Sequence, residues 1–575
     1  MDKEIITGSE ALIRSLIAEG VNMVFGYPGG AILPVYDKLY DYSEDLKHIL
    51  VRHEQGAIHA AQGYARVSNR PGVVIVTSGP GAANVITGLS DAQMDSTPVV
   101  VISGQVSSQF LGSDAFQETD VVGITQPITK WALQVRRAAD IPAAVARAFY
   151  IAASGRPGPV VLDIAKDAQI GQLEWSQYKK LNFIRSYNPR PSISPRAMVE
   201  AAALINDSKR PLILAGHGVM IAGAEKELAL LAEKADIPVA TTLLGLSTIP
   251  SSHPLNKGML GMHGNLGPNC LTNRADLLIA IGMRFDDRVT SDSSKYAPQA
   301  KILHIDIDSS EFNRNIKVDA TIHGDARDAL RQLVPLIEPT KHKQWLELFD
   351  KCAEAEKESV IEPELGHSGP ITMGQAVKAV ADATAGEAVL VTDVGQNQMM
   401  SARYFRFAFP RSIITSGGLG TMGFGLPAAI GAKMAAPDRT VCYFCGDGGF
   451  QMTIEELGTI MQYQTPVKMI VLNNDFLGNV RQWQDLFFGK RFSQTPMLNP
   501  DFCMICRAYG IEAETVEQSA DLAAAVGRML ACPGPYLLNV RIASEGMVFP
   551  MIAPGAAVDD IMLSKDTKFS LDNAM

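Results

Sequence analysis

The sequence predicts an α/β protein built from three doubly wound units, each a parallel sheet with helices on both faces. Apolar runs of strand length alternate with helix-like segments in three separate stretches of the chain. Several of these runs end in glycine-rich or polar turns, and this is where open α/β sheets bind ligands. The length of 575 residues leaves room for three or four domains with ample core.

The first unit is expected over residues 1–170. Its helices are predicted over residues 9–19, with Thr7 or Ser9 as the N-cap, and over residues 53–67. Its strands are predicted over residues 21–25, 73–76 and 99–102, and the segment 156–163 closes the unit. The alternation indicates a parallel sheet.

Two further α/β units are expected, each preceded by a linker. Residues 171–190 are predicted as the first linker, and the second unit as residues 191–340. Residues 341–370 are charged, lack a clear strand and contain a helix-like piece, so they are predicted as the second linker. The third unit is expected over residues 371–545, and a short tail over residues 546–575.

The composition argues against several classes of protein. A net charge of −10 disfavours a nucleic-acid binder, which needs a basic face, but it is compatible with small anionic substrates. The first eight residues show no signal-peptide pattern, and no apolar run reaches the length of a membrane span. We therefore expect a soluble, cytoplasmic protein with no nucleic-acid or membrane partner.

Four of the seven cysteines have the spacing of a zinc site, as Cys442-x-x-Cys445 and Cys503-x-x-Cys506. The first pair lies in a predicted strand, where residues three apart point to opposite faces, so both cannot bind one ion. The second pair lies in a helix-like run and is predicted to be buried thiols. We expect neither zinc nor disulfides.

Two short motifs carry most of the functional information. Gly446-Asp447-Gly448 follows the apolar run 441–445, and Asn473-Asn474 follows the run 467–472. Each is predicted to be a turn at the C-terminal end of a buried parallel strand. The Asp447 carboxylate and the Asn474 amide oxygen are hard ligands that suit Mg²⁺, and the glycines let the backbone approach a phosphate.

This pair of motifs resembles the diphosphate-binding motif of thiamine-diphosphate enzymes. The resemblance implies that Asp447, Asn474 and the main-chain carbonyl of Phe476 hold Mg²⁺. It also implies that the first unit binds the aminopyrimidine ring and the third unit the diphosphate. In this family the cofactor lies between chains, so a dimer is the minimum active unit. Taken alone, the motifs are also compatible with ordinary turns after strands.

The family's catalytic chemistry maps onto further residues. Glu54 stands where the family's glutamate protonates the pyrimidine N1′, although a helix-start glutamate favoured by the dipole is the alternative. Met422 stands at the position of the apolar wedge that bends the cofactor. The remaining residues expected to contact thiamine diphosphate are Tyr27, Val394, Gly395, Gln396, Asn397, Gly420, Gly446, Gly448, Gly449, Leu477, Gly478, Asn479 and Val480.

Within the family, the local motifs are most similar to acetohydroxyacid synthase, over nearly the whole chain. The motifs that carry this resemblance are 25–31, 113–118, 284–289 and 481–484. The subfamily binds FAD in its middle unit, and this implies a central FAD-binding domain here. The residues expected to contact FAD are Arg156, Gly216, Gly218, Thr242, Leu243, Met262, His263, Gly282, Arg284, Asp286, Arg288, Asp306, Ile307 and Asp325.

The resemblance also implies how the second keto acid is recognised. Arg288 would face its carboxylate, and Trp483 would offer an apolar surface that favours an ethyl over a methyl group, since one buried methylene contributes about 0.8 kcal/mol. Gly30 and Phe116 would complete this substrate site. Gln117 and Lys166 would be catalytic residues in the same channel, with a loop amide and a surface lysine as the alternatives.

The implied activity is decarboxylation of pyruvate and transfer of its hydroxyethyl unit to pyruvate or 2-ketobutyrate, in branched-chain amino-acid biosynthesis. The implied assembly is a homodimer or homotetramer with a small regulatory subunit. A thiamine-dependent oxidase, a flavin-free synthase and a degenerate scaffold are the alternatives. Asn397, Asn479 and Ser107 stand where many relatives have His, Met and Pro, and this puts substrate preference and inhibitor response in doubt.

Overall fold

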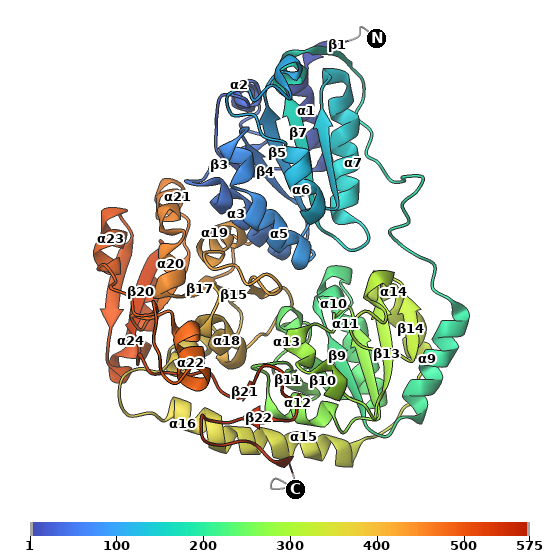
Figure 1. Cartoon of the computed structure of the whole chain (residues 1–575), viewed down its shortest axis with the longest axis vertical. Coiled ribbons are helices and arrows are strands. Elements are labelled where there is room, and N and C mark those ends of the chain that lie inside the picture. The colour runs from blue at the N-terminus through green and yellow to red at the C-terminus, as the bar shows by residue number, and fades with distance from the viewer. Residues whose placement is uncertain (1–3, 572–575) are drawn as a thin grey trace.

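The computed structural model describes residues 4–571, and its main feature is three parallel six-stranded sheets, each in its own α/β unit (Figure 1). The predicted fold class is therefore confirmed. The first unit is predicted to begin at residue 1 and the tail to end at residue 575. Residues 1–3 and 572–575 of these predicted segments lie outside the described residues. No helix within residues 4–571 is long and apolar enough to cross a membrane.

The first sheet has the strand order β3-β2-β4-β5-β7-β6. Its strands are β2 (Met23–Gly26), β3 (Lys47–Leu50), β4 (Gly72–Val76), β5 (Val99–Gln105), β6 (Trp131–Val135) and β7 (Pro159–Ala165). Its helices are α1 (Gly8–Glu19), α2 (Leu33–Asp41), α3 (Glu54–Ser68), α4 (Pro80–Ala83), α5 (Ile86–Met94), α6 (Val121–Thr125), α7 (Ile141–Ala153) and α8 (Lys166–Ile170). The helix predicted over residues 9–19 is confirmed as α1, with Thr7 as its N-cap.

The central sheet has the order β11-β10-β9-β12-β13-β14. Its strands are β9 (Pro211–Ala215), β10 (Val239–Thr241), β11 (Asn256–Met259), β12 (Leu277–Ile281), β13 (Lys301–Asp306) and β14 (Ala320–His323). Its helices are α9 (Pro195–Asp207), α10 (His217–Ala222), α11 (Glu225–Ala235), α12 (Leu266–Thr272), α13 (Asp287–Thr290) and α14 (Ala326–Leu333).

The third sheet has the order β16-β15-β17-β18-β20-β19. Its strands are β15 (Val389–Thr392), β16 (Ile413–Ile414), β17 (Val441–Gly446), β18 (Lys468–Asn473), β19 (Glu512–Val516) and β20 (Tyr536–Arg541). Its helices are α17 (Met373–Ala383), α18 (Gln396–Tyr404), α19 (Gly425–Ala435), α20 (Asp447–Gln451), α21 (Leu457–Tyr463), α22 (Gly478–Phe487), α23 (Phe502–Ala508) and α24 (Ser519–Ala531).

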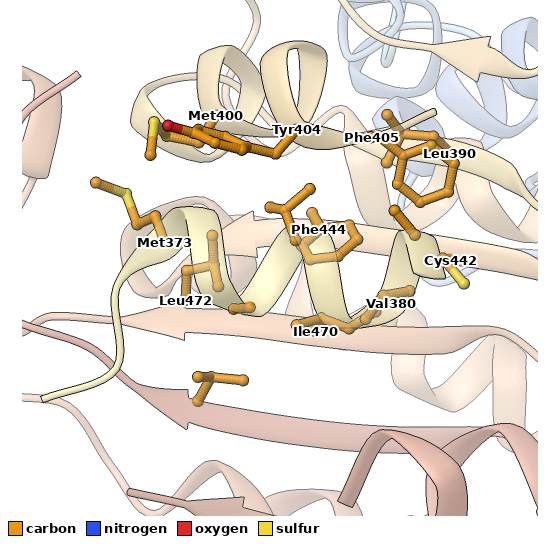
Figure 2. Close-up of a cluster of buried hydrophobic side chains, with 14 of the residues drawn as sticks. Met373, Val380, Leu390, Met400, Tyr404, Phe405, Cys442, Phe444, Ile470 and Leu472 are labelled. Atoms are coloured by element: carbon orange, nitrogen blue, oxygen red, sulfur yellow. The ribbon is translucent and has the colours of Figure 1, made fainter. Parts of the chain in front are cut away.

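Side chains along each strand of the third sheet point alternately to its two faces, and they contribute to a separate hydrophobic core on each face. Figure 2 shows one of them, where Met373 and Val380 of α17 lie over Phe444 and Ile470 of the sheet. Cys442 belongs to this core, whereas Cys445 belongs to the core on the opposite face. The predicted opposite orientation of the two cysteines is therefore confirmed, and it follows from the two-residue period of a strand. Cys503 and Cys506 are buried thiols on α23, as predicted.

The segments between the units are more ordered than predicted. In the first predicted linker, β8 (Gln172–Trp175) pairs antiparallel with β1 (Glu4–Thr7). The second predicted linker is helical, with α15 (Lys343–Glu356), a π-helical turn (Lys357–Ile361) and α16 (Glu362–Leu365) running beneath the central and third units (Figure 1). The tail forms the hairpin β21 (Met551–Ile552) and β22 (Ile561–Met562), whose Ile552 and Ile561 enter a core of the central unit.

The first and third units are joined by close packing of α3 against α19. Gly431 on α19 lies so near α3 that an added Cβ would be 1.8 Å from the carbonyl oxygen of Ala60. Only glycine permits this approach of two helix backbones. The close packing sets the position of the first unit relative to the strand ends of the third.

Candidate active site

The two motifs singled out in the sequence lie side by side at one edge of the third sheet. β17 and β18 are adjacent parallel strands, and Gly446 at the end of β17 pairs with Leu472 near the end of β18. Three helices, α18, α20 and α22, begin at this edge, directly after residues 395, 446 and 477. Their free main-chain N–H groups and helix dipoles make this edge suited to an anion such as a diphosphate.

The residues predicted to bind Mg²⁺ are close together and preorganised. The Asp447 side chain is buried, and its Oδ2 accepts hydrogen bonds from the main-chain N–H of Asp475 (2.8 Å) and from Asn499 Nδ2 (2.7 Å). Asn474 Oδ1 accepts from the main-chain N–H of Phe476 (3.1 Å). Burial raises the pKa of the Asp447 carboxyl, whereas a bound cation would favour its ionised form. One carboxylate, one amide oxygen and one carbonyl fit a magnesium ion that keeps phosphate and water ligands.

Asn499 was not identified from the sequence. Its amide also donates to Asn473 Oδ1 (3.1 Å) and to Asp475 Oδ1 (3.0 Å), so it connects the loops after β17 and β18. Its sequence context, Leu498-Asn499-Pro500, is that of an ordinary turn. Local sequence therefore held no signal for this contact.

The side chains predicted to line the thiamine site lie close to the glycines at the same edge of the third sheet. A Cβ added to Gly448 would lie 2.7 Å from Leu477 Cδ2 and 3.7 Å from Met422 Cε. A Cβ added to Gly395 would lie within 4 Å of both Asn397 and Asn479. The remaining close pairs are Gly420 with Val394, Gly446 with Asn397, and Gly478 with Gln396 and Asn474.

Several polar atoms in this wall are buried without a partner in the described chain. They are Gln396 Oε1, Asn397 Oδ1 and Asn479 Oδ1. Buried polar atoms are nearly always hydrogen-bonded, so unpaired ones at a strand-end pocket are the mark of a site for a polar ligand. The wall is therefore compatible with the polar parts of thiamine diphosphate.

The predicted site residues of the first unit lie on its own loops and helix starts. Glu54 is the first residue of α3, and its Oε2 accepts from Asn84 Nδ2 at 3.0 Å. Gln117, with φ of 60°, packs beside Gly79, while Gly30 and Lys166 are exposed. Phe116 is 87% exposed and Tyr27 is 40% exposed.

Within residues 4–571, no hydrogen bond joins these first-unit residues to the loops after β17 and β18 of the same chain. Glu54 and Asp447 of one chain are therefore not joined by a hydrogen bond among the described residues.

A cavity of about 650 Å³ lies where the three units meet. All but one of the residues predicted to contact FAD line it. They are Arg156, Gly218, Thr242, Leu243, Met262, His263, Gly282, Arg284, Asp286, Arg288, Asp306, Ile307 and Asp325. The exception is Gly216, which packs behind the wall, where an added Cβ would be 2.3 Å from the carbonyl oxygen of Gly282.

The charges around this cavity are partly paired. Arg156, one of the residues expected to contact FAD, forms ion pairs with Asp308 (3.1 Å) and Glu311 (2.7 Å). Burial raises the pKa of Asp306 to about 7 and lowers the pKa of His263 to about 3, so the His263 ring is neutral near pH 7. His263 Nδ1 is buried without a partner in the described chain. The cavity wall carries both arginines and carboxylates, among them Asp286 and Asp325. Such a mixed polar lining fits an elongated, polar cofactor, and the arginines are the groups suited to its anionic part.

The same cavity reaches the thiamine wall. Val394, Gly395, Gly420 and Asn479 line it together with Trp483. Trp483 and Asn479 also line a second cavity of about 550 Å³ beside α22, with Val480 and Phe488 among its other lining residues. Trp483 therefore stands between the two cavities, next to the predicted thiamine site.

Comparisons with known proteins agree with this geometry. Models of the thiamine pyrophosphate enzyme N-terminal TPP-binding, central and C-terminal TPP-binding domains match residues 6–124, 198–333 and 393–540. A probable acetolactate synthase large subunit of Methanocaldococcus jannaschii is 44% identical over 96% of this chain and 95% of its own length. The chain belongs to the acetolactate synthase family. Other members include the large subunit of Lactococcus lactis, 42% identical over 99% of this chain and 98% of its own, and the isozyme 3 large subunit of Escherichia coli, 42% identical over 98% and 99%.

Membership of the acetolactate synthase family confirms the resemblance identified from the motifs. The two TPP-binding models match the first and third units, and the central model matches the unit whose strand ends contribute to the large cavity.

Proposed function

We propose that the protein is an acetolactate synthase that decarboxylates pyruvate and transfers the two-carbon unit to pyruvate or 2-ketobutyrate. The observation that supports this most directly is the meeting of three features at one edge of the third sheet. These are the Asp447–Asn474 pair, Met422 beside Gly448, and a cavity that runs from the central unit to Trp483. The products, 2-acetolactate and 2-aceto-2-hydroxybutyrate, would serve branched-chain amino-acid biosynthesis in the cytoplasm.

Bound thiamine diphosphate would supply the carbon nucleophile and the electron sink. Asp447, Asn474 and the carbonyl of Phe476 would hold Mg²⁺, and Asn499 would orient Asp447. The N–H groups of the α18 and α20 starts would hold the diphosphate oxygens. Met422, which lies near Gly448, would support the bent form of the cofactor.

Glu54 would hold the proton that the pyrimidine ring exchanges during the reaction. Because Glu54 makes no hydrogen bond to the Asp447 edge among the described residues of its own chain, we propose that a second copy supplies it, so that the smallest active unit is a homodimer. The large exposure of apolar Phe116 (87%) and of Tyr27 (40%) supports a covering partner on this face. A homotetramer of two such dimers is compatible with the same arrangement.

FAD is proposed to occupy the large cavity, with Arg284 near its diphosphate and Asp306 near a ribose hydroxyl. Asp306 stands at the C-terminal end of β13, the position where an acidic residue binds ribose in related sheets. Arg156 is paired with two carboxylates, Asp308 (3.1 Å) and Glu311 (2.7 Å), whereas Arg284 is paired with one, Asp286, at the longer distance of 3.6 Å. Arg284 is therefore the better candidate for neutralising the FAD diphosphate.

The second keto acid is proposed to enter between the two cavities. Arg288, on the wall of the large cavity, would bind its carboxylate, and Trp483 would contact its alkyl group. Gly30, Phe116, Gln117 and Lys166 would reach this point from the second copy. In this arrangement the arginine would recognise the carboxylate end of the acceptor, and the aromatic face would recognise its alkyl end.

A small regulatory subunit is proposed as a partner, because the relatives are named as large subunits. Gel filtration with a candidate small subunit, together with activity measured with and without valine, tests this. The absence of both a complex and a change in activity would contradict it.

The deciding experiment incubates the purified protein with pyruvate, thiamine diphosphate, Mg²⁺ and FAD and measures acetolactate. Glu54→Gln is expected to lower the rate by about 100-fold or more, the scale of a lost general acid–base group. Glu44→Gln, an exposed glutamate on the same unit, serves as the matched control. Pyruvate consumption that yields acetate and a reduced electron acceptor would instead identify a thiamine-dependent oxidase.

A further inference from the structure

A buried ionic cluster on the first unit holds a loop of the third unit. Asp91 and Asp95 lie one helical turn apart on and just after α5, and Arg66 of α3 reaches both of them. We call Arg66, Asp91 and Asp95 the α5 clamp. The loop it faces is residues 415–421, which directly precedes Met422.

Asp95 binds the main chain of this loop. Its Oδ2 accepts from the N–H of Gly417 at 2.8 Å, and its Oδ1 accepts from the N–H of Gly418 at 2.7 Å. Oδ2 also accepts from Arg66 at 2.9 Å. Both carboxylate oxygens are therefore committed, and two consecutive amides of the loop depend on one side chain.

Asp91 and Arg66 bind the two ends of the loop. Asp91 Oδ1 accepts from the hydroxyls of Ser416 and Thr421, the latter at 3.3 Å. Arg66 donates to the carbonyl oxygen of Thr415. The loop is thus held at its beginning, middle and end by one cluster from another unit.

The clamp is almost fully removed from solvent, with side-chain exposure of 5% for Arg66 and 0% for both aspartates. Two carboxylates face one guanidinium, so one negative charge has no cationic partner in the clamp. Hydrogen-bond donors of the 415–421 loop stabilise the carboxylates further. Within the described residues, Asp91 Oδ2 is the one carboxylate oxygen of the clamp without a hydrogen-bond partner, and it lies 3.8 Å from Arg66. The other three carboxylate oxygens are hydrogen-bonded. The network favours this one position of the loop, because any other arrangement would leave more buried charge unpaired.

The clamped loop borders both predicted cofactor sites. Gly417, Gly418 and Gly420 line the large cavity, and Met422 follows immediately, with its Cε near Gly448. The carbonyl oxygen of Asp95 also accepts from His217 Nδ1 at 3.1 Å, and His217 belongs to the central unit and lines the same cavity. Asp95 therefore contacts all three units at the point where they meet.

We propose that Asp95, supported by Asp91 and Arg66, is a positioning residue that orders the 415–421 loop for binding of FAD and for placement of Met422. A loop with three glycines in this stretch loses more backbone entropy on ordering than other loops, so it needs external hydrogen bonds to hold one conformation. The part of the proposal that concerns cofactors rests on the proposed function, and the part that concerns loop order does not.

The test is Asp95→Asn, which keeps the shape but places an amide NH₂ against Arg66 or a glycine N–H. In the cofactor-free protein, hydrogen exchange of the peptide covering residues 415–421 is expected to be about tenfold faster, the size of effect when a charge-assisted hydrogen bond is lost. The FAD dissociation constant, measured by quenching of flavin fluorescence, is expected to rise by about tenfold for the same reason.

Asp163→Asn is the matched control, because Asp163 is equally buried in the first unit but, among residues 4–571, its side chain accepts hydrogen bonds only from Ser103, Gln105 and Gln134. It is expected to lower thermal stability without changing loop exchange or FAD affinity. Ser416→Ala, which removes the hydroxyl that donates to Asp91 and accepts from the main-chain N–H of Thr421 (2.8 Å), is the second variant if Asp95→Asn does not fold.

The proposal would be overturned if the 415–421 peptide of Asp95→Asn exchanged hydrogen at the wild-type rate. The same result in Ser416→Ala would overturn it if that variant is used instead. So would an equal loss of FAD affinity in Asp163→Asn. If the wild-type protein binds no FAD, the proposed FAD site is wrong, while the exchange experiment still decides whether the clamp orders the loop.

Discussion

Glu456 should make the stability of this protein depend on pH in a direction opposite to that of most acidic residues. It lies at the end of a 3₁₀ turn (Ile454–Glu456) of the third unit and is fully buried. Its Oε1 accepts from the main-chain N–H groups of Arg52 (3.0 Å) and His53 (3.1 Å), directly before Glu54. Thr459 donates to its Oε2 at 2.6 Å.

The magnitude follows from the shift of its pKa. Burial, the largest cause, raises the pKa of Glu456 from 4.5 to about 7, and the charge of Glu455 adds to this. Because the folded state holds the proton more tightly, the stability from this group is present below pH 4.5 and is lost as the pH rises through 7. A shift of this size corresponds to about 3 kcal/mol, of which about 2 kcal/mol lies between pH 5.5 and 8.

The perturbation is Glu456→Gln, which keeps the acceptor oxygen and cannot ionise. We expect the melting temperature of the variant relative to wild type to rise between pH 5.5 and 8 by about 4–8 °C, at 2–4 °C per kcal/mol for a domain of this size. Differential scanning fluorimetry at both pH values measures this. Glu456→Ala leaves two main-chain N–H groups without an acceptor, so it should cost about 3 kcal/mol or more even at pH 5.5.

Glu512→Gln, an exposed glutamate of the same unit, should show no such pH-dependent difference. A difference in melting temperature between Glu456→Gln and wild type that is constant across pH, or that falls as the pH rises, would contradict a raised pKa of Glu456. Either result would mean that Glu456 stays ionised in the folded protein.

Three other predictions follow from single contacts. Asn499→Ala removes the 2.7 Å hydrogen bond to Asp447, so the Mg²⁺ concentration needed for thiamine diphosphate binding should rise about 10–100-fold, measured by titration of circular dichroism. Trp483→Leu should lower the preference for 2-ketobutyrate over pyruvate about fourfold, the value of one buried methylene, measured as a product ratio in a competition assay. Glu356→Gln leaves the buried Arg403 guanidinium without its negatively charged partner, so it should cost about 3–5 kcal/mol in chemical denaturation.

Each of these has its own contradicting result. Unchanged Mg²⁺ dependence in Asn499→Ala would mean that Asp447 needs no orienting donor. An unchanged product ratio in Trp483→Leu would place the acceptor's alkyl group elsewhere. For Glu356→Gln, the control is Asp350→Asn, which breaks the more exposed ion pair with Lys257 and should cost no more than about 1 kcal/mol. Equal costs for the two would show that burial of the Glu356–Arg403 pair does not matter.

The sequence alone determined the fold class and the edge of the sheet where Mg²⁺ and diphosphate are proposed to bind. These features depend on local patterns. Apolar runs such as 441–445 define buried strands, and the turns that follow must lie at the carboxyl edge of a parallel sheet. The N-cap at Thr7 and the opposite orientation of Cys442 and Cys445 were predictable for the same reason, since each depends on residues a few positions apart.

Only the tertiary structure decided which distant groups support that edge. Asp95 bonds to Gly418 across 323 positions, and Glu456 bonds to the N–H of Arg52 across 404. Three further features also depend on residues far apart in the sequence. They are the hydrogen bond of Asn499 to Asp447, the pairing of Arg156 with Glu311, and the position of Gly216 behind the cavity wall. A buried carboxylate or amide has no recognisable local pattern, because its partners are main-chain groups brought to it by the packing of whole units.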